Sequence, residues 1–340
     1  MKINVSNKKI LEFYTDYNYP QKVDSKSVLN ELLNLCKAFE RKTGYSFDNK
    51  NILDAGTGTG DRIIEVAKNY PNSKITAVDF CQSSLTIAKE KSIAAKLDNI
   101  RFIEADLQQL DNLNNESFDV IFSMGVIHHL ASPIIGTRNL YNHLKPDGLF
   151  FCYLYGEHGG VQRMHKKNIL NILANNDSVA NKIEIAKQLN YAPSEYGWHD
   201  VNEDNSDNLY ALLADCFINP NEKLYNITTI NELIQKSRFQ GFSLFGITTL
   251  DAGALFVDIE IHDTSLPLRD RISVTRFDQI KINKDLIKRF LPLSSLKKYE
   301  LLDHLYQPNG YTVIGWKSQD NTMKNFPDYY KKNSVFSTAI

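Results

Sequence analysis

Three glycines at alternate positions, Gly56, Gly58 and Gly60, follow an acidic residue, Asp54, in the segment LDAGTGTG. Glycines at a strand-to-helix turn let the backbone bend sharply and approach a ligand closely, and the helix that follows offers unpaired N–H groups to it. Dinucleotide-binding enzymes have the spacing GxGxxG, whereas this segment has GxGxG. A carboxylate at Asp54 would repel a pyrophosphate but suits an ammonium group. The segment therefore favours a ligand with an amino-acid moiety over NAD.

Two further acidic residues stand at the ends of the next two apolar runs. Asp79, in AVDF, follows Gly60 by 19 residues, close to the distance at which an acid in an open α/β sheet accepts hydrogen bonds from ribose hydroxyls. Asp106, in EADL, is placed to meet the amino group of an adenine, with Leu107 against the ring. These residues predict that the ligand also carries ribose and adenine.

The segments that carry these residues alternate between apolar runs typical of strands and amphipathic stretches typical of helices. The apolar runs are 51–55, 74–80, 100–106, 118–124 and 148–155. Because helices separate successive strands, we expect right-handed crossovers and a parallel sheet that is covered on both faces.

Over residues 49–156 the chain resembles the class I S-adenosylmethionine (SAM)-dependent methyltransferases. The resemblance rests on the glycine loop at 54–60, on Asp79 and Asp106, on FDVIFSMGVIHHL and on the LKPDGLFF that follows it. It implies that the three glycines line the methionine part of SAM and that Asp54 reaches its amino group. It further implies that Asp79 holds the ribose hydroxyls and Asp106 the adenine. The remaining cofactor-binding residues that it implies are Thr57, Phe80, Leu107, Met124 and Gly125.

The resemblance implies an α/β fold, with a Rossmann-like methyltransferase sheet of seven strands, an N-terminal helical cap and α+β C-terminal additions. Four segments are predicted: a helical cap at 1–48, the SAM-binding domain at 49–160, a helical insertion with completing strands at 161–262 and an accessory region at 263–340. The first segment contains an aromatic stretch at 13–20 and an amphipathic helix within 24–42. The aromatic stretch either packs on the core as a staple or forms a lid over cofactor or substrate.

Methyl transfer from SAM is an in-line displacement on an activated sulfonium. The protein therefore contributes mainly position, and a base only when the nucleophile must lose a proton. The candidate catalytic residues are Tyr155 and His158, after the fifth strand, and His129, after the fourth. A structural role competes in each case, and in this superfamily one ring of a pair such as His128 and His129 often packs structurally.

Residues 214–246 resemble an accessory region of some bacterial class I methyltransferases, including relatives of protein-lysine methyltransferases. This resemblance implies a macromolecular or peptide-like acceptor, whereas a structural cap that closes over a small molecule is the competing interpretation. We therefore expect the methyl acceptor to be either a protein side chain, such as lysine, or a small metabolite. The alternative function is a module that binds SAM or a nucleotide without turnover.

The composition argues against several other classes of protein. The chain has 39 Lys and Arg against 40 Asp and Glu, a net charge of −1, so no bulk basic field indicates nucleic-acid binding. No apolar run approaches a membrane span, and the N-terminus lacks the apolar stretch of a secretory signal. The four cysteines are far apart and lack the spacing of metal ligands, so we expect buried, reduced thiols and no metal. A soluble, cytoplasmic enzyme is predicted.

Overall fold

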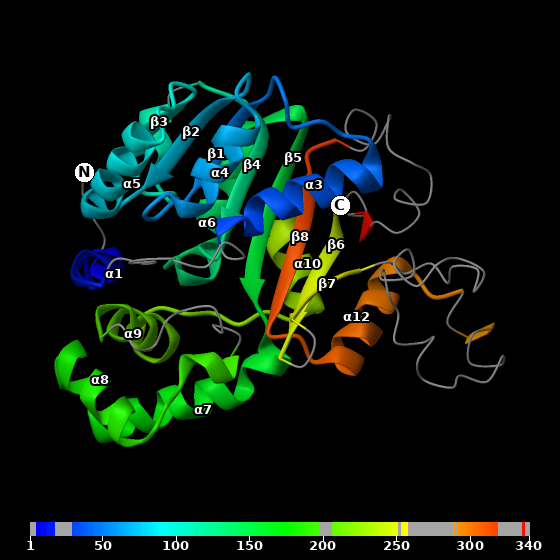
Figure 1. Cartoon of the computed structure of the whole chain (residues 1–340). Helices are drawn as coiled ribbons and strands as arrows, with labels where there is room; N and C mark the ends of the chain where they lie inside the picture. Colours follow the sequence, from blue (N-terminus) through cyan, green and yellow to red (C-terminus); the bar gives the residue numbers. More distant parts are fainter. Residues whose placement is uncertain are drawn as a thin grey trace.

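A single mixed β-sheet forms the centre of the molecule (Figure 1). The computed structural model describes residues 5–17, 29–113, 115–196, 206–250, 253–257, 288–289, 292–318 and 335–336. The strands of the sheet are β1 (Asn51–Ala55), β2 (Lys74–Asp79), β3 (Ile100–Glu104), β4 (Phe118–Met124), β5 (Leu144–Tyr155), β6 (Gly241–Thr249), β7 (Gly253–Phe256), β8 (Gly310–Trp316) and β9 (Val335–Phe336).

The strand order is β3-β2-β1-β4-β5-β8-β6-β7, and β9 pairs with β6. Strands β1 to β5 pair in parallel, whereas β8 lies antiparallel between β5 and β6. The path from β3 to β6 contains seven strands and confirms the predicted methyltransferase sheet. Strands β7 and β9 extend it beyond that prediction, because both pair with β6.

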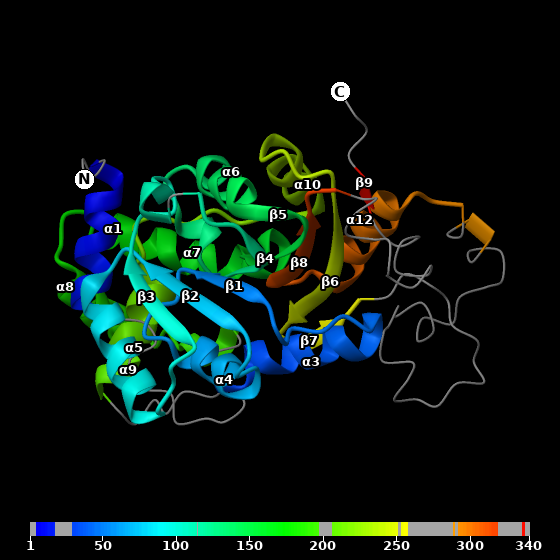
Figure 2. The ribbon, with the colours of Figure 1, turned by 90° about the horizontal axis from the view of Figure 1, so that it is seen from above.

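Helices cover both faces of the sheet, as the apolar side chains on both sides of its strands require (Figure 2). One face carries α3 (Glu31–Thr43), α4 (Asp61–Asn69) and α5 (Gln82–Ala94), and the other carries α6 (Pro133–His143), α10 (Ile227–Lys236) and α12 (Ser295–Tyr306). In β4, Val120 and Phe122 belong to the hydrophobic cluster of the first face, and Ile121 belongs to that of the second. The helix predicted within 24–42 is α3, and its Phe39 lies 5.1 Å from Phe151 of β5, centroid to centroid.

A second layer of helices lies beyond the carboxyl end of β5 (Figure 1). From here on we call this layer the helical cap; it contains the first helix of the cap predicted at 1–48, whereas α3 packs on the sheet. The helical cap consists of α1 (Val5–Asp16), α7 (Glu157–Leu173), α8 (Val179–Gln188), η3 (Pro193–Tyr196), α9 (Ser206–Leu213) and a π-helical turn, η4 (Ala214–Ile218). Phe13 of α1 is buried in the same hydrophobic cluster as Leu170, Leu213 and Phe217. The first helix therefore packs with the insertion that follows β5, although roughly 150 to 200 residues separate them in the sequence.

Some predicted features fall outside the described residues. These are Tyr19 and Pro20 of the aromatic stretch and most of the accessory region predicted at 263–340. The division of the chain into four segments stays a prediction. In the ranges that are described, no helix is both long enough and apolar enough to cross a membrane. The four cysteines are free and buried, as predicted.

Candidate active site

The glycine loop joins β1 to α4 and is held against β2. The backbone amides of Gly56 and Thr57 donate to the Val78 carbonyl at 2.8 and 2.9 Å. The three glycines of the loop have φ angles of 91°, 56° and 79° in chain order, values that L-residues with a Cβ rarely adopt. A Cβ on Gly56 would lie 2.3 Å from Cγ2 of Val126, so packing as well as conformation requires glycine there.

Asp79, the last residue of β2, stabilises this loop by a hydrogen bond. Its Oδ2 accepts a hydrogen bond from the Gly58 amide at 2.8 Å, and its Oδ1 accepts one from the Cys81 amide at 2.9 Å. The carboxyl group is buried, and burial raises its pKa. Each carboxylate oxygen has a further lone pair, so these bonds leave Asp79 able to accept from ribose hydroxyls, the role predicted for it.

Two more buried carboxyl groups lie at the ends of the neighbouring strands. Asp54, near the end of β1, is 6% exposed, and burial raises its pKa to about 6. Asp106 follows β3, and its Oδ1 accepts a hydrogen bond from the Gln108 amide at 2.8 Å. Leu107 is buried beside it. The three predicted acidic ligands therefore end adjacent strands at one edge of the sheet.

The next strand, β4, ends at Met124 and is followed by Gly125, which has a φ of 83°. A Cβ built on Gly125 would meet no atom within 4 Å, so the backbone is open at this point. Phe80, after β2, lies 6.2 Å from the ring of Tyr14 in the helical cap. All the residues predicted to bind the cofactor thus line the carboxyl ends of four neighbouring strands.

His128, His129 and Tyr155 form an aromatic cluster where β4 and β5 end. The ring of His128 lies nearly flat on Tyr155, with centroids 3.8 Å apart, and His129 meets Tyr155 edge-on at 5.6 Å. Burial lowers the pKa of both imidazoles, so both are neutral near neutral pH. Nδ1 of His129 lies 2.8 Å from the Asn221 carbonyl oxygen. Because a carbonyl oxygen only accepts, Nδ1 carries the proton and Nε2 holds a lone pair that can take a proton from a substrate.

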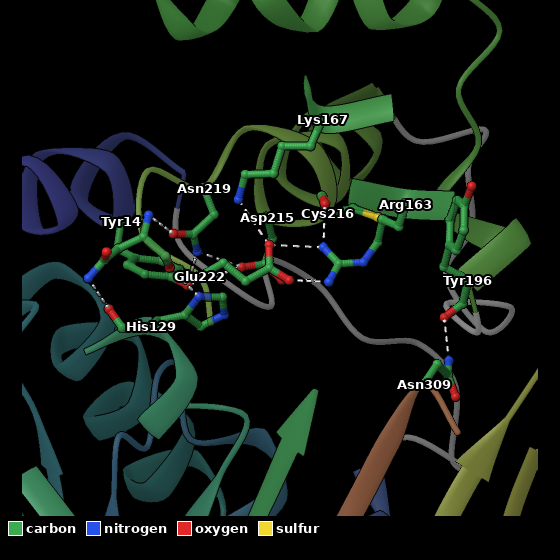
Figure 3. A network of polar contacts seen from close by, with 11 residues as sticks. Tyr14, His129, Arg163, Lys167, Tyr196, Asp215, Cys216, Asn219, Glu222 and Asn309 are labelled. Carbon is green, nitrogen blue, oxygen red and sulfur yellow. Dashed lines mark hydrogen bonds and ion pairs between the residues drawn. The ribbon is translucent and has the colours of Figure 1, made fainter. Parts of the chain in front are cut away.

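Two cations of α7 and one carboxylate have their side chains buried together (Figure 3). The guanidinium of Arg163 lies 5.1 Å from the Tyr155 centroid and donates to Glu222 and to the Cys216 carbonyl. Lys167 Nζ lies 2.9 Å from Glu222 Oε2. Burial would raise the pKa of Glu222, but the two cations lower it to about 2. Glu222 is therefore ionised and holds both cations.

Tyr14 of α1 connects the helical cap to the ends of the strands (Figure 3). Its hydroxyl donates to Asp215 Oδ1 at 3.0 Å and accepts from Asn219 Nδ2 at 2.8 Å. Its ring lies 6.2 Å from Phe80, after β2, and 6.4 Å from His129, after β4. These contacts favour the lid interpretation of the aromatic stretch.

His158, the remaining catalytic candidate, lies in the first turn of α7. Its Nε2 is 3.4 Å from Oδ2 of Asp303 in α12, a buried carboxyl group that also accepts a hydrogen bond from Tyr311 of β8. These contacts tie α7 to α12 and β8, whereas Tyr155 faces the histidine pair. The structure thus brings Tyr155 and His129 together. A catalytic role for His158 stays a prediction, because its described polar contact is with Asp303 and not with these two residues.

Comparison with known proteins gives the family. A family model described as a methyltransferase domain matches residues 46–214, about half of the chain. The chain belongs to the SAM-dependent methyltransferases. Its cofactor is SAM.

Similar proteins share different parts of this chain. An uncharacterised protein of Synechococcus sp. is 28% identical over 293 residues, which cover 79% of this chain and 67% of that protein. A malonyl-[acyl-carrier protein] O-methyltransferase of Bacillus cereus is 35% identical over 34% of this chain and 40% of that enzyme. The solved structure of PKMT2 from Rickettsia typhi in complex with AdoHcy has a TM-score of 0.54 at 16% identity and covers 89% of this chain and 54% of that one. The chain thus spans about half the length of two of these three proteins and two thirds of the other, and its likeness to PKMT2 is one of fold.

The methyltransferase site fits the amino-acid end of SAM. Asp54 is a buried carboxyl group whose raised pKa reflects the lack of water around it, so an ammonium group there would compensate its charge. The open backbone at Gly125 and the positive φ angles of the loop leave room for a close approach. The assignment of each residue to a part of SAM stays a prediction.

Sequence reasoning missed the polar residues of the cap. Arg163 and Lys167 stand one turn apart on α7, on the same face as the buried Leu170. Charged residues at positions where an amphipathic helix expects apolar ones were the signal that could have found them. Asp215 and Asn219 lie in a stretch noted only as part of an accessory region, and their link to Tyr14 has no local signature in the sequence.

Proposed function

We propose that this methyltransferase acts on a small molecule, which binds between the carboxyl ends of β4 and β5 and the helical cap. The observation that carries the proposal is the position of His129. It is a neutral imidazole with a lone pair on Nε2, and it lies between Tyr155 of the sheet and Tyr14 of the cap. A base in this place suits a nucleophile that must lose a proton before it is methylated.

SAM supplies a methyl group that is already activated on a sulfonium. His129 would accept the proton of the acceptor at Nε2, while the Asn221 carbonyl holds the ring through Nδ1. Tyr155 keeps the imidazole in place by its edge-on contact, and Arg163 and His128 hold the Tyr155 ring from its faces. The main contribution of the protein is thereby to position the acceptor, and its second contribution is a proton acceptor.

The closed contacts of the cap favour a small acceptor over a side chain of a folded protein. Tyr14 bonds directly to Asp215 and Asn219 across the strand ends, and Phe13 beside it is part of the buried cluster of the cap. A lysine side chain on the surface of a protein partner would have to displace this layer to reach His129. A protein acceptor is therefore the second candidate.

The test is transfer of tritium from methyl-labelled SAM into a host-cell extract that is then separated by size. We expect label in the small-molecule fraction, and a loss of transfer in His129→Ala with SAM affinity preserved in calorimetry. Label that enters protein instead would favour the lysine acceptor. SAM binding without transfer to any fraction would identify a binding module and contradict the proposal.

A further inference from the structure

Asp215 is a buried carboxyl group whose hydrogen-bond donors are neutral. It is 3% exposed and accepts from the Tyr14 hydroxyl at 3.0 Å and, more weakly, from the Asn219 amide at 3.5 Å. Ionised groups in such surroundings are normally paired with an opposite charge, because burial removes the hydration that stabilises a lone charge in water.

The cations of the cap do not pair with it. Arg163 and Lys167 occupy both oxygens of Glu222. Glu222 is therefore the charge partner of both cations. Among the residues that the structure describes, no Lys, Arg or His nitrogen forms an ion pair with Asp215. The cap therefore holds one satisfied group of charges around Glu222 and one carboxylate that lacks a cation.

The backbone around Asp215 is unusual in a second, independent way. Residues 214–218 form a π-helical turn, which is closed by a hydrogen bond from the backbone N–H of Asn219 to the Ala214 carbonyl at 2.9 Å. Such turns cost stability in a helix and occur frequently at functional sites. Here the turn brings Asp215 and Asn219 to the same hydroxyl of Tyr14 (Figure 3).

The position of Asp215 relates it to the reaction. It is one hydrogen bond away from Tyr14, whose ring contacts Phe80 on the cofactor side and His129 on the acceptor side. A positive charge held by Asp215 would therefore lie near the base and near the ends of β2 and β4.

We propose that Asp215 binds the amino group of the acceptor, so that the substrate of this enzyme is a small amine that is methylated on nitrogen. The inference rests on the proposed function. The acceptor would arrive as an ammonium ion paired with Asp215, and one proton would pass to Nε2 of His129 and on to solvent. The nitrogen lone pair then forms the C–N bond as the C–S bond breaks, and the bond electrons stay on sulfur. The nitrogen becomes cationic in this step, so Asp215 stabilises the transition state as well as the bound substrate.

The charges of the cap argue against an anionic acceptor. Arg163 and Lys167 are buried cations of the cap, but Glu222 holds both, and Arg163 also donates to the Cys216 carbonyl. A phosphate or carboxylate would have to displace Glu222, whose side chain is fully buried.

The experiment uses the full chain, methyl-labelled SAM and the small-molecule fraction of host-cell extract, with the products separated by cation exchange at neutral pH. We expect the label to be retained as methylated amine and to resist alkali, which releases methanol from methyl esters. Asp215→Asn, which keeps the shape and removes the charge, should lower the transfer at least about tenfold with SAM affinity unchanged, since hydrogen bonds to charged groups contribute about 1.5–3 kcal/mol. Asp215→Glu should restore part of the transfer.

The matched control is Glu195→Gln, which removes a carboxylate from an exposed ion pair with Lys166 in the same cap and should leave the transfer unchanged. Label in products that pass through the column would overturn the amine and leave the proposed function intact, as would full transfer by Asp215→Asn. Absence of any transfer by the wild-type chain would instead remove the proposed function and this inference with it. Should Asp215→Asn lose its fold, measured by circular dichroism, the charge-keeping Asp215→Glu and the retention of the wild-type product decide the question.

Discussion

Asp54 carries an electrostatic conflict between stability and cofactor binding. Its pKa is ordinarily 3.8 and is raised to about 6 by burial, so folding favours the protonated form. As pH rises from about 4 to about 6, the unfolded chain loses this proton while the folded protein keeps it, so folding must take up a proton and stability is lost over this window. Above it the cost amounts to at most about 3 kcal/mol, from the size of the shift. Binding of an ammonium group needs the ionised form.

We therefore predict that Asp54→Asn makes the protein without cofactor more stable, and more so at pH 8 than at pH 5. The same variant should bind SAM at least about tenfold more weakly, because a charged hydrogen-bond partner is lost. Urea unfolding at the two pH values and calorimetric titration measure both effects. A variant that is less stable at pH 8 would show that Asp54 is paired in the free protein and that burial does not control it.

Two glycines of the site, one in the glycine loop and one after β4, differ in their surroundings. Gly56 and Gly125 have similar positive φ angles, 91° and 83°, but a Cβ would clash with Val126 only at Gly56. We predict that Gly56→Ala destabilises the protein by about 2–4 kcal/mol, since strain and overpacking add. Gly125→Ala, with strain alone, should cost about 1–2 kcal/mol. Equal losses in urea unfolding would mean that Val126 moves aside without cost.

Besides the packing of Phe13, two hydrogen bonds of the Tyr14 hydroxyl hold the first helix to the rest of the cap. We predict that Tyr14→Phe keeps the ring contacts with Phe80 and His129 but exposes the amides of α1 to hydrogen exchange about 5–30 times faster, because two hydrogen bonds of roughly 1 kcal/mol each are lost. Tyr17→Phe is the control, since the Tyr17 hydroxyl makes no hydrogen bond within the described part of the chain. If both variants exchange like the wild type, packing of Phe13 alone holds the helix.

How far the sequence predicts these elements depends on the distance over which their contacts act. The glycine loop, Asp79 and the strands before residue 155 follow from local spacing and periodicity, and the structure agrees with them. Strand β8 lies between β5 and β6, a position that no local pattern in the sequence encodes. The contact of Tyr14 with Asp215 joins residues 201 positions apart, and only the packing of two separate amphipathic faces produces it.

The whole sheet depends on the strand that comes last among its seven. β8 pairs with β5 through seven residues and with β6 on its other side, and its Trp316 is fully buried. We predict that a chain ended after Asn309 loses cooperative unfolding and SAM binding, because β5 and β6 are left with unpaired edges. A chain ended after Ser318 keeps all seven strands and should bind SAM with wild-type affinity. Cooperative unfolding of the shorter chain, followed by circular dichroism, would show that β8 is an addition to a core that folds without it.

The distant partner of α1 has a consequence for synthesis of the chain. This helix leaves the ribosome well before the turn that receives Tyr14, which follows about 200 residues later. At typical elongation rates of 5–20 residues per second, roughly 10–40 s pass before that turn exists. During this time Phe13, which is buried in the finished protein, has no native cap to pack against. A nascent chain of this methyltransferase therefore exposes the apolar side chains of α1 to chaperones until that turn has been synthesised.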